Sequence, residues 1–443
     1  MTPLRLSLLF PVFFSALLFP GPAAQPRFPY EPGHFIVQLA DSGAMPAVLA
    51  ALRRHAGKTA KIHTPKQLCA DPPIWLLKFD PAPAADKALL AFVAGLPGVA
   101  LAQHDHHLSL RATFPDDPLF PAQWQWHNDG VNGTVADADV DAPEAWEISS
   151  GGVTPDGDTI VVAVIDDGVR LRHPDLAPNL WRNHGEIPNN HVDDDDNGYT
   201  DDYYGWNTAF ENGQVDLGFH GTQVAGILAA RGGNATGVAG MAGHARIMPI
   251  VGGAGLESEV IQAYAYALAQ RRAYNQSNGR KGAFIVATNS SWGVDGLSYQ
   301  DAPVWCGFYG HLGQAGMINC AATANRDWNV DEAGDMPTSC PSPFLISVTA
   351  SNSGDQRGEA AYGPLSVDLA APGIGVLTTS PGDTYALASG TSYASPLVAG
   401  IAALLYAAPC SGLSALAKAA PAQAALAVKQ LILEGADTLP QLA

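Results

Sequence analysis

Residues 160–168 read Ile-Val-Val-Ala-Val-Ile-Asp-Asp-Gly, and this stretch decides the fold. Its first six residues are apolar on both faces of an extended chain, which is typical of a strand buried inside a parallel sheet. The strand ends in a carboxylate, Asp166, and Gly168 follows where the chain turns. Because ligands and catalytic groups of open α/β sheets gather at the carboxyl ends of the strands, Asp166 is a candidate functional residue.

Similar apolar runs alternate with helical patterns through the rest of the chain. Strands are expected at 160–165, 247–251, 284–288, 317–322 and 345–349, and helices at 257–272, 392–407 and 422–433. Strands without a polar face that alternate with helices indicate a parallel sheet covered by helices. We therefore expect residues 113–443 to form an α/β domain with three layers, α/β/α, around a mostly parallel central sheet.

The first 24 residues have the pattern of a secretory signal peptide. Arg5 precedes an apolar run from residue 6 to 19, and small residues lead to a cleavage point near Ala24. The run contains Pro11 and falls short of the roughly 20 residues that span a bilayer, which disfavours a membrane anchor. We expect a secreted protein, extracellular or periplasmic, with no membrane contact after the signal is removed.

Residues 25–112 form a second piece, in which short strands and Ala/Leu-rich helices recur. The strands are expected at 34–39, 74–79 and 99–103, and the helices at 46–55 and 87–96. This order of elements indicates a small α+β domain with two strand–helix halves.

Charge separates the two pieces. The whole chain of 443 residues has 23 basic and 42 acidic side chains and a formal net charge of −19, so we expect no nucleic-acid partner. Residues 1–112 contain 10 basic and 6 acidic residues, whereas residues 113–443 contain 13 and 36. With 47% hydrophobic and 15% charged residues, the chain is globular rather than disordered.

Five cysteines agree with an exported chain. Cys69 lies in the first piece, which leaves Cys306, Cys320, Cys340 and Cys410 with three possible full pairings that the sequence does not rank. Cys320 lies in an apolar run and also fits a buried thiol. No pair has the spacing of a zinc or redox motif.

Three short segments have the residues for nucleophilic catalysis. Asp166 ends a strand, His220 opens the helical segment 220–226, and Ser392 begins an apolar helix. A serine hydroxyl is a weak nucleophile until an imidazole takes its proton, and a carboxylate must hold that imidazole in the correct tautomer. Each segment alone also fits a plain structural role, as a capped loop, a helix start or a turn. Together they predict a Ser-His-Asp triad.

The helix that begins at Ser392 contributes to the same chemistry. Its N-terminus offers free N–H donors and the positive end of a dipole, both of which favour the oxyanion that forms on attack. Pro396 is expected in the first turn of this helix, where its missing N–H costs little.

These motifs resemble those of the subtilisin-like serine proteases, the subtilases (peptidase family S8). The match lies in Asp-Asp-Gly at 166–168, in the His-Gly-Thr motif at 220–226 and in the Gly-Thr-Ser motif at 390–400, in the family's chain order of Asp, His and Ser. The resemblance extends from about residue 30 to 440. It implies a subtilisin-like fold and a serine endopeptidase that cleaves polypeptides through an acyl-enzyme. Asp-Asp-Gly is similar to the kexin branch, while the other motifs are similar to the bacterial branch.

The resemblance implies further site residues. Asn325 corresponds to the family's oxyanion donor, although Ala324 stands where family members usually have glycine. Ser291, Trp292 and Gly293 are similar to the edge strand on which subtilases bind the peptide substrate. Trp292 alternatively belongs to the core.

The resemblance also implies that residues 25–112 are a propeptide that assists folding, inhibits the enzyme and is removed by it. We expect the junction between residues 107 and 114, and the basic and acidic pieces complement each other electrostatically. We expect a self-processing zymogen and a monomer. Two alternatives are a peptide ligase or macrocyclase on the same fold and an inactive calcium-binding homologue.

An acidic loop at residues 189–202 predicts a structural Ca²⁺ site. Oxygen ligands at 193, 195 and 197 followed by Gly198 match the first half of an EF-hand loop, but its closing glutamate is absent. The candidate ligands are Asp193, Asp195, Asn197, Tyr199, Asp201 and Asp202. Six carboxylates within residues 193–202 repel one another without a cation, although a solvated acidic loop is the alternative. We expect calcium to protect the loop from self-digestion, and no organic cofactor.

Overall fold

The structure is a computed structural model that describes residues 30–56, 61–80, 86–106, 114–131, 133–216, 218–253 and 255–439. The signal peptide predicted for residues 1–24 and the junction predicted between residues 107 and 114 lie outside the described residues. The chain divides into two compact units, residues 1–110 and 111–443, each of which is described by itself.

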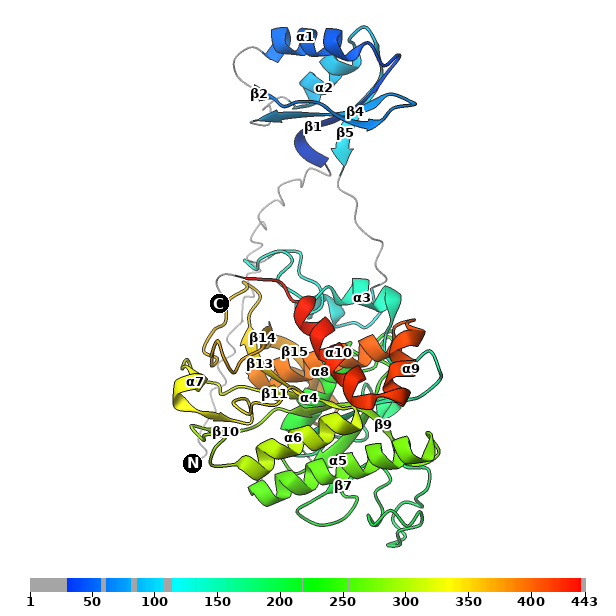
Figure 1. Cartoon of the computed structure of the whole chain (residues 1–443), viewed down its shortest axis with the longest axis vertical. Helices are drawn as coiled ribbons and strands as arrows, with labels where there is room; N and C mark the ends of the chain where they lie inside the picture. Colours follow the sequence, from blue (N-terminus) through cyan, green and yellow to red (C-terminus); the bar gives the residue numbers. More distant parts are fainter. Residues whose placement is uncertain are drawn as a thin grey trace, which may run out of the picture. The chain divides into compact units, whose positions relative to one another are not determined.

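The first unit combines an antiparallel sheet with two helices (Figure 1). Its elements are β1 (Tyr30–Leu39), α1 (Met45–Ala56), β2 (Lys61–Ile62), β3 (Lys66–Cys69), β4 (Ile74–Asp80), α2 (Asp86–Ala94) and β5 (Val99–His106). The strand order is β2-β4-β1-β5, and β3 pairs with β4. Alternate residues of β1, among them Phe35 and Val37, are buried in one core with Val48 and Leu52 of α1. The unit therefore has the α+β composition expected from its two strand–helix halves.

The second unit is built on a seven-stranded sheet in which every pair of neighbours is parallel. Its order is β14-β13-β11-β9-β6-β8-β7, with β6 (Ile160–Asp166), β7 (Trp206–Asn207), β8 (Arg246–Val251), β9 (Phe284–Ser290), β11 (Ile318–Ala322), β13 (Leu345–Ser351) and β14 (Leu369–Pro372). Short antiparallel pairs are β10 (Val294–Asp295) with β12 (Asp335–Met336) and β15 (Ile374–Ser380) with β16 (Thr384–Ser389). The parallel sheet predicted from the sequence is confirmed.

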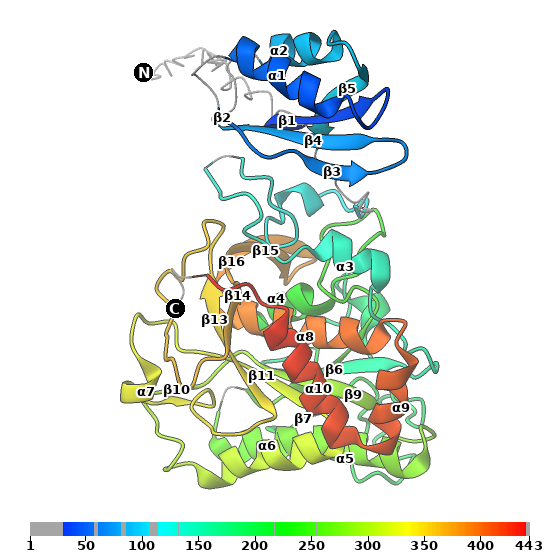
Figure 2. The same ribbon diagram turned by 45° about the horizontal axis from the view of Figure 1, so that its top comes forward.

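Helices cover both faces of this sheet. They are α3 (Ala142–Ile148), α4 (His220–Ala229), α5 (Glu257–Ser277), α6 (Pro303–Ala315), α7 (Val330–Ala333), α8 (Thr391–Ala407), α9 (Ser411–Ala419) and α10 (Pro421–Glu434). Alternate residues of β6 belong to different cores: Val162 and Val164 pack with α4, α8 and α10, and Ala163 and Ile165 pack with α5 and α6. Figures 1 and 2 show α5 and α6 on one side of the sheet and α4 and α8 on the other. The three-layer α/β/α architecture is therefore confirmed.

Among the described residues, no single helix is long and apolar enough to cross a membrane. Within the described ranges, one pair of helices, α8 and α9, reaches the required length and composition when taken together, and the two helices are bent by 103° at their break.

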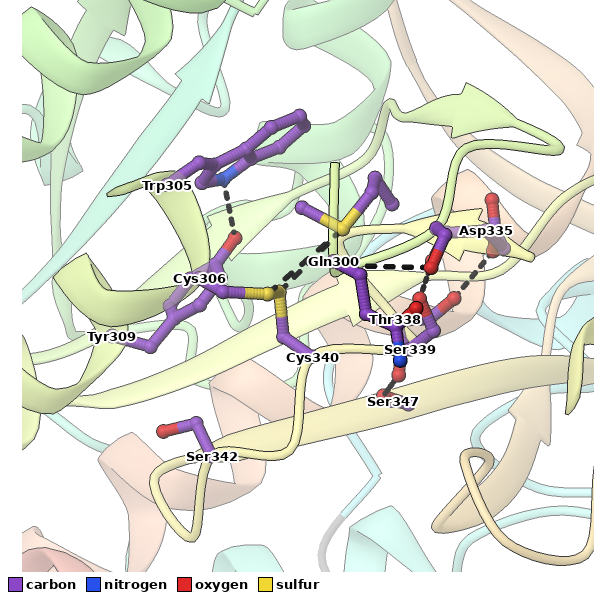
Figure 3. The surroundings of a disulfide bond; sticks show 12 residues. Gln300, Trp305, Cys306, Tyr309, Asp335, Thr338, Ser339, Cys340, Ser342 and Ser347 are labelled. Carbon is purple, nitrogen blue, oxygen red and sulfur yellow. Dashed lines mark hydrogen bonds between the residues drawn. A yellow bond between two sulfur atoms is a disulfide. The ribbon is translucent and has the colours of Figure 1, made fainter. Parts of the chain in front are cut away.

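A disulfide joins Cys306 of α6 to Cys340 (Figure 3). Both sulfur atoms lie beside Met336 Sδ, at 4.0 and 3.6 Å respectively. Cys320 is buried in β11 and Cys410 is exposed, and neither is bonded to another cysteine. Burial raises the pKa of the Cys320 thiol well above its usual range, so this side chain is an inert part of the core.

Candidate active site

Asp166 and His220 are joined directly. Asp166 is the last residue of β6 and His220 is the first residue of α4. Nδ1 of His220 lies 2.9 Å from Oδ1 and 3.1 Å from Oδ2 of Asp166. Only 4% of the Asp166 side chain is exposed, against 34% of the His220 side chain. The sheet therefore holds the carboxylate inside, and the imidazole stands between it and solvent.

The two groups alter each other's pKa in a physically consistent way. Burial raises the pKa of Asp166, and the hydrogen bond from His220 opposes that rise. Burial works to lower the pKa of His220, but the hydrogen bond and negative charge of Asp166 outweigh it, and the pKa is raised. Asp166 accepts a hydrogen bond from Nδ1–H of His220. The neutral imidazole therefore carries its proton on Nδ1, and Nε2 is free to accept a proton.

Asp167 holds the backbone of the same histidine. Its Oδ2 accepts hydrogen bonds from the N–H groups of Phe219 (3.0 Å) and His220 (3.2 Å), and its Oδ1 accepts from that of Gly221 (2.7 Å). A carboxylate at this place satisfies the free N–H groups of the first turn of α4 and complements its dipole. This role of Asp167 was not predicted from the sequence, because the residues that it binds lie more than 50 positions further along the chain.

Ser392 is the second residue of α8, so its N–H is one of the first four in the helix without an intrahelical partner. Its hydroxyl donates to the carbonyl of Ser291 at 3.0 Å. The neighbouring ring of Tyr393 lies 5.9 Å from the ring of His220, and the Tyr393 hydroxyl donates to Gln223 of α4. The start of α8 is therefore packed against the start of α4, although no hydrogen bond joins His220 to Ser392 within the described part of the chain.

Asn325 lies in the exposed loop after β11. Its Oδ1 accepts from the N–H (2.9 Å) and the hydroxyl (3.1 Å) of Thr391, the residue before Ser392. With Oδ1 fixed in this way, the Nδ2 group remains as the donor beside the nucleophile. Ala324, which replaces the expected glycine, is buried, and its N–H donates to Oδ2 of Asp335 at 3.1 Å.

The predicted substrate-binding residues lie between β9 and β10 rather than in a strand, and both of their side chains, those of Ser291 and Trp292, turn inward. The Ser291 hydroxyl is bonded within the protein, and Nε1 of Trp292 donates to Ile165 O at 2.6 Å. Trp292 also stacks on Trp305, with ring centroids 5.7 Å apart, so its side chain belongs largely to the core. Gly293 is exposed. Binding of substrate by this segment stays a prediction, and the backbone is the part available for it.

In the acidic loop, the structure brings together two predicted ligands and one that the sequence reading missed. Carboxylate oxygens of Glu186, Asp193 and Asp195 lie within 4.8 Å of one another. Glu186 is buried, and its Oε1 and Oε2 accept from the N–H groups of Asp194 (2.8 Å) and Asp201 (2.9 Å). Three converging carboxylates fit a hard divalent cation such as Ca²⁺.

The side chains of the other four candidates are engaged elsewhere. Asn197 Oδ1 accepts from the N–H of Tyr199 at 2.7 Å, and the Tyr199 ring packs 4.9 Å from that of Trp206. Asp201 accepts from two backbone N–H groups at 3.0 Å. Asp202 is buried, which raises its pKa to about 6, and it accepts from the Tyr266 hydroxyl at 2.8 Å. Metal binding by these four residues stays a prediction.

The parallel sheet, the histidine held by a buried aspartate and the serine at a helix N-terminus are features of a serine hydrolase of the α/β class. The sequence comparison identifies the family. Residues 157–442 match the model of the subtilase family, and the chain belongs to that family.

Named relatives agree with this assignment. A thermophilic serine proteinase from a Bacillus species is 31% identical over 65% of this chain and 61% of that protein. Thermitase from Thermoactinomyces vulgaris is 28% identical over 66% of this chain and 85% of its own length. An extracellular protease of Xanthomonas campestris is 29% identical over 80% and 60%. The chain thus spans about three fifths of the first and third of these relatives.

A solved structure of a protease from Pseudoalteromonas arctica matches with a TM-score of 0.50 and 24% identity, over 71% of this chain and 99% of that one. This likeness supports the fold alone.

Proposed function

We propose that this chain is a serine endopeptidase that hydrolyses peptide bonds in polypeptides. Ser392 is the nucleophile, His220 is first the general base and then the general acid, and Asp166 orients His220. The observation that carries the proposal is the direct hydrogen bond that Nδ1–H of His220 donates to the buried Asp166 carboxylate. His220 lies on α4, which packs beside the N-terminus of α8 that presents Ser392.

Each step of the reaction uses a group described above. The Ser392 hydroxyl leaves its bond to Ser291 O and transfers its proton to Nε2 of His220 as Oγ attacks the carbonyl carbon. Asp166 accepts the bond from Nδ1–H and stabilises the imidazolium. The hydrogen bond between serine and histidine is often long in the free enzyme and tightens when substrate binds.

The charge that develops on the substrate oxygen requires donors that are already in place. Asn325 Nδ2 and the Ser392 N–H are those donors, since Thr391 fixes the asparagine oxygen and the helix leaves the Ser392 N–H free. His220 then gives this proton to the leaving amine as the peptide bond breaks, which completes the acyl-enzyme. In the second half of the reaction, His220 activates a water molecule that hydrolyses the acyl-enzyme.

A structural Ca²⁺ fits the acidic loop. Glu186, Asp193 and Asp195 would hold it, and the bound cation would neutralise carboxylates that otherwise repel one another. No catalytic step uses this ion.

The same proposal covers synthesis as a secreted zymogen. Its support is the signal-like sequence of residues 1–24, the compact α+β unit that precedes the catalytic unit, and a relative named as an extracellular protease. In this interpretation the first unit is the propeptide, which inhibits the enzyme until the enzyme cleaves it.

A fluorophosphonate probe tests the catalytic assignment. The matured wild-type enzyme should be labelled, and Ser392→Ala, matured by a trace of wild-type enzyme, should not. Mass spectrometry of peptide products should then show hydrolysis rather than joined or cyclic peptides. Absence of labelling in correctly matured wild-type protein would refute the proposal and favour an inactive homologue.

A further inference from the structure

We propose that Ser291 is a positioning residue that fixes the nucleophile, because its hydroxyl replaces a helix hydrogen bond that Pro396 removes. The inference rests on the proposed role of Ser392. It assigns to the side chain of Ser291 a task different from substrate binding, which was its predicted role.

Pro396 leaves one carbonyl of α8 without its helical donor. Pro396 is the sixth residue of α8, so the prediction that it falls in the first turn was wrong: a turn has 3.6 residues, and Pro396 lies in the second turn. In an α-helix the carbonyl of residue i accepts from the N–H of residue i+4. The donor for Ser392 O would be the N–H of residue 396, and proline has none. Ser392 is only 8% exposed, and a buried carbonyl without a donor is costly.

Ser291 supplies the missing donor. Its Oγ lies 2.7 Å from Ser392 O and donates to it. In return, Ser291 O accepts from the Ser392 hydroxyl at 3.0 Å. The two serines, 101 positions apart, are therefore joined by two hydrogen bonds, one to the backbone of the nucleophile and one from its reactive oxygen.

Residues behind Ser291 fix the direction of its proton. Asn289 of β9 donates from Nδ2 to Ser291 Oγ at 2.9 Å, and its Oδ1 accepts from the Ser395 hydroxyl at 2.7 Å. Because the Ser291 oxygen already accepts this bond, its own proton is directed to Ser392 O. All of these side chains are buried, so water does not replace a lost partner. The central sheet thereby holds the first turn of α8 through an ordered chain of hydrogen bonds.

Loss of the Ser291 hydroxyl should affect the reaction of the nucleophile and the binding of substrate differently. A nucleophile displaced by a fraction of an ångström reacts more slowly, while the subsites that bind the rest of the peptide are unaffected. Loss of the Ser291 hydroxyl should therefore lower kcat and leave KM nearly unchanged.

A double-mutant cycle tests this inference, because Pro396→Ala restores the N–H donor to Ser392 O. We expect Ser291→Ala to lower kcat by about 10- to 100-fold in the wild-type background, with KM within about twofold. In the Pro396→Ala background the same substitution should lower kcat by less than about threefold. An equal loss of kcat in both backgrounds would overturn the inference.

Ser395→Ala is the matched control, since it removes one hydrogen bond from an equally buried serine in the same chain of bonds. Its melting temperature should fall about as much as that of Ser291→Ala, but its loss of kcat should be at least about threefold smaller. Equal losses of kcat in Ser291→Ala and Ser395→Ala would also refute the inference. If Pro396→Ala does not fold, the comparison of these two variants tests the inference by itself. Wild-type enzyme that resists the fluorophosphonate probe would instead refute the proposed function.

Discussion

Carboxylates lie side by side in two regions of the second unit, and they are satisfied in different ways. At the end of β6, Asp166 binds an imidazole and Asp167 binds three backbone N–H groups. In the acidic loop, Glu186, Asp193 and Asp195 converge within 4.8 Å, and among the described residues no lysine or arginine forms an ion pair with them. Both groups accept hydrogen bonds from N–H groups, but those of the first group hold the catalytic histidine and its helix, whereas those of the second group come from the loop itself. The second group still has uncompensated charge, and a cation would complete it.

The largest effect should come from Asp166→Asn. The amide would favour the wrong tautomer of His220, so we expect kcat to fall about 10⁴-fold, the magnitude known for the same change in another serine protease. Steady-state kinetics on a peptide substrate measure the effect. Asp196→Asn, at an exposed position of the acidic loop, is the control and should leave kcat within about twofold. A loss of kcat below tenfold for Asp166→Asn would contradict the role of Asp166 in positioning His220.

Asp167→Asn separates positioning from charge. Burial lowers the pKa of His220, but Asp166 and the charge of Asp167 raise it above its ordinary value. Removing the second charge should lower that pKa, so the neutral base persists to lower pH. The acid limb of kcat/KM should move down by a few tenths of a pH unit to about one unit, together with a roughly tenfold loss of kcat/KM.

The other titratable group near His220 does not interfere with this measurement. Burial raises the pKa of Tyr393 to about 12, so this side chain stays neutral across the profile. An acid limb that stays in place or moves to higher pH would show that Asp167 acts only as a cap of α4.

Glu186→Gln tests the acidic loop. Removal of one of three converging charges should weaken Ca²⁺ binding by about tenfold or more, because affinity depends on the number of charged ligands. The rise in melting temperature on adding Ca²⁺ should shrink, while kcat at saturating Ca²⁺ should change less than about twofold. Titration calorimetry and thermal unfolding measure both quantities, with Asp196→Asn as the control. Unchanged Ca²⁺ affinity in Glu186→Gln would remove this residue from the site.

The smallest effect concerns Asp335 of β12, a buried carboxylate whose cross-strand neighbour in β10 is Asp295. Burial raises its pKa to about 7, despite hydrogen bonds from Thr338 and the Ala324 N–H. Since the folded state holds this proton more tightly than the unfolded chain, stability should fall as pH rises from about 4 to 7. Asp335→Asn should reduce that fall, by a few kcal/mol at most. The melting temperatures of the wild-type protein and Asp335→Asn are measured across this pH range. An equal change of melting temperature with pH in the two proteins would contradict the prediction.

Much of the fold followed from local patterns. The strand predicted at 160–165 is β6, and the helices predicted at 257–272 and 392–407 are α5 and α8, each with longer or shifted ends. Apolar runs and helical periodicity depend on residues that are close together in the chain, so a single sequence is enough to recognise them. The α6 helix was not predicted, and its three glycines, together with Cys306, weaken its pattern.

The site was predictable only where a motif marks it. Asp166, His220 and Ser392 lie in recognisable segments. The roles of Asp167, Glu186 and Ser291 depend on partners brought together by folding, and for Ser291 that partner is 101 positions away. The disulfide partner of Cys306 was equally open, because pairing depends on which cysteines the sheet and helices bring into reach.

The bond between Cys306 and Cys340 also makes the intervening chain a closed covalent ring, with β11 and the exposed residues 325–327 inside it. A polypeptide-cleaving enzyme meets copies of itself as substrates, and an exposed loop tip is a preferred place for a cut. A cut between the two cysteines would open the ring without releasing a fragment. The damaged molecule would keep its full mass on a gel run without reductant and separate into two bands only after reduction.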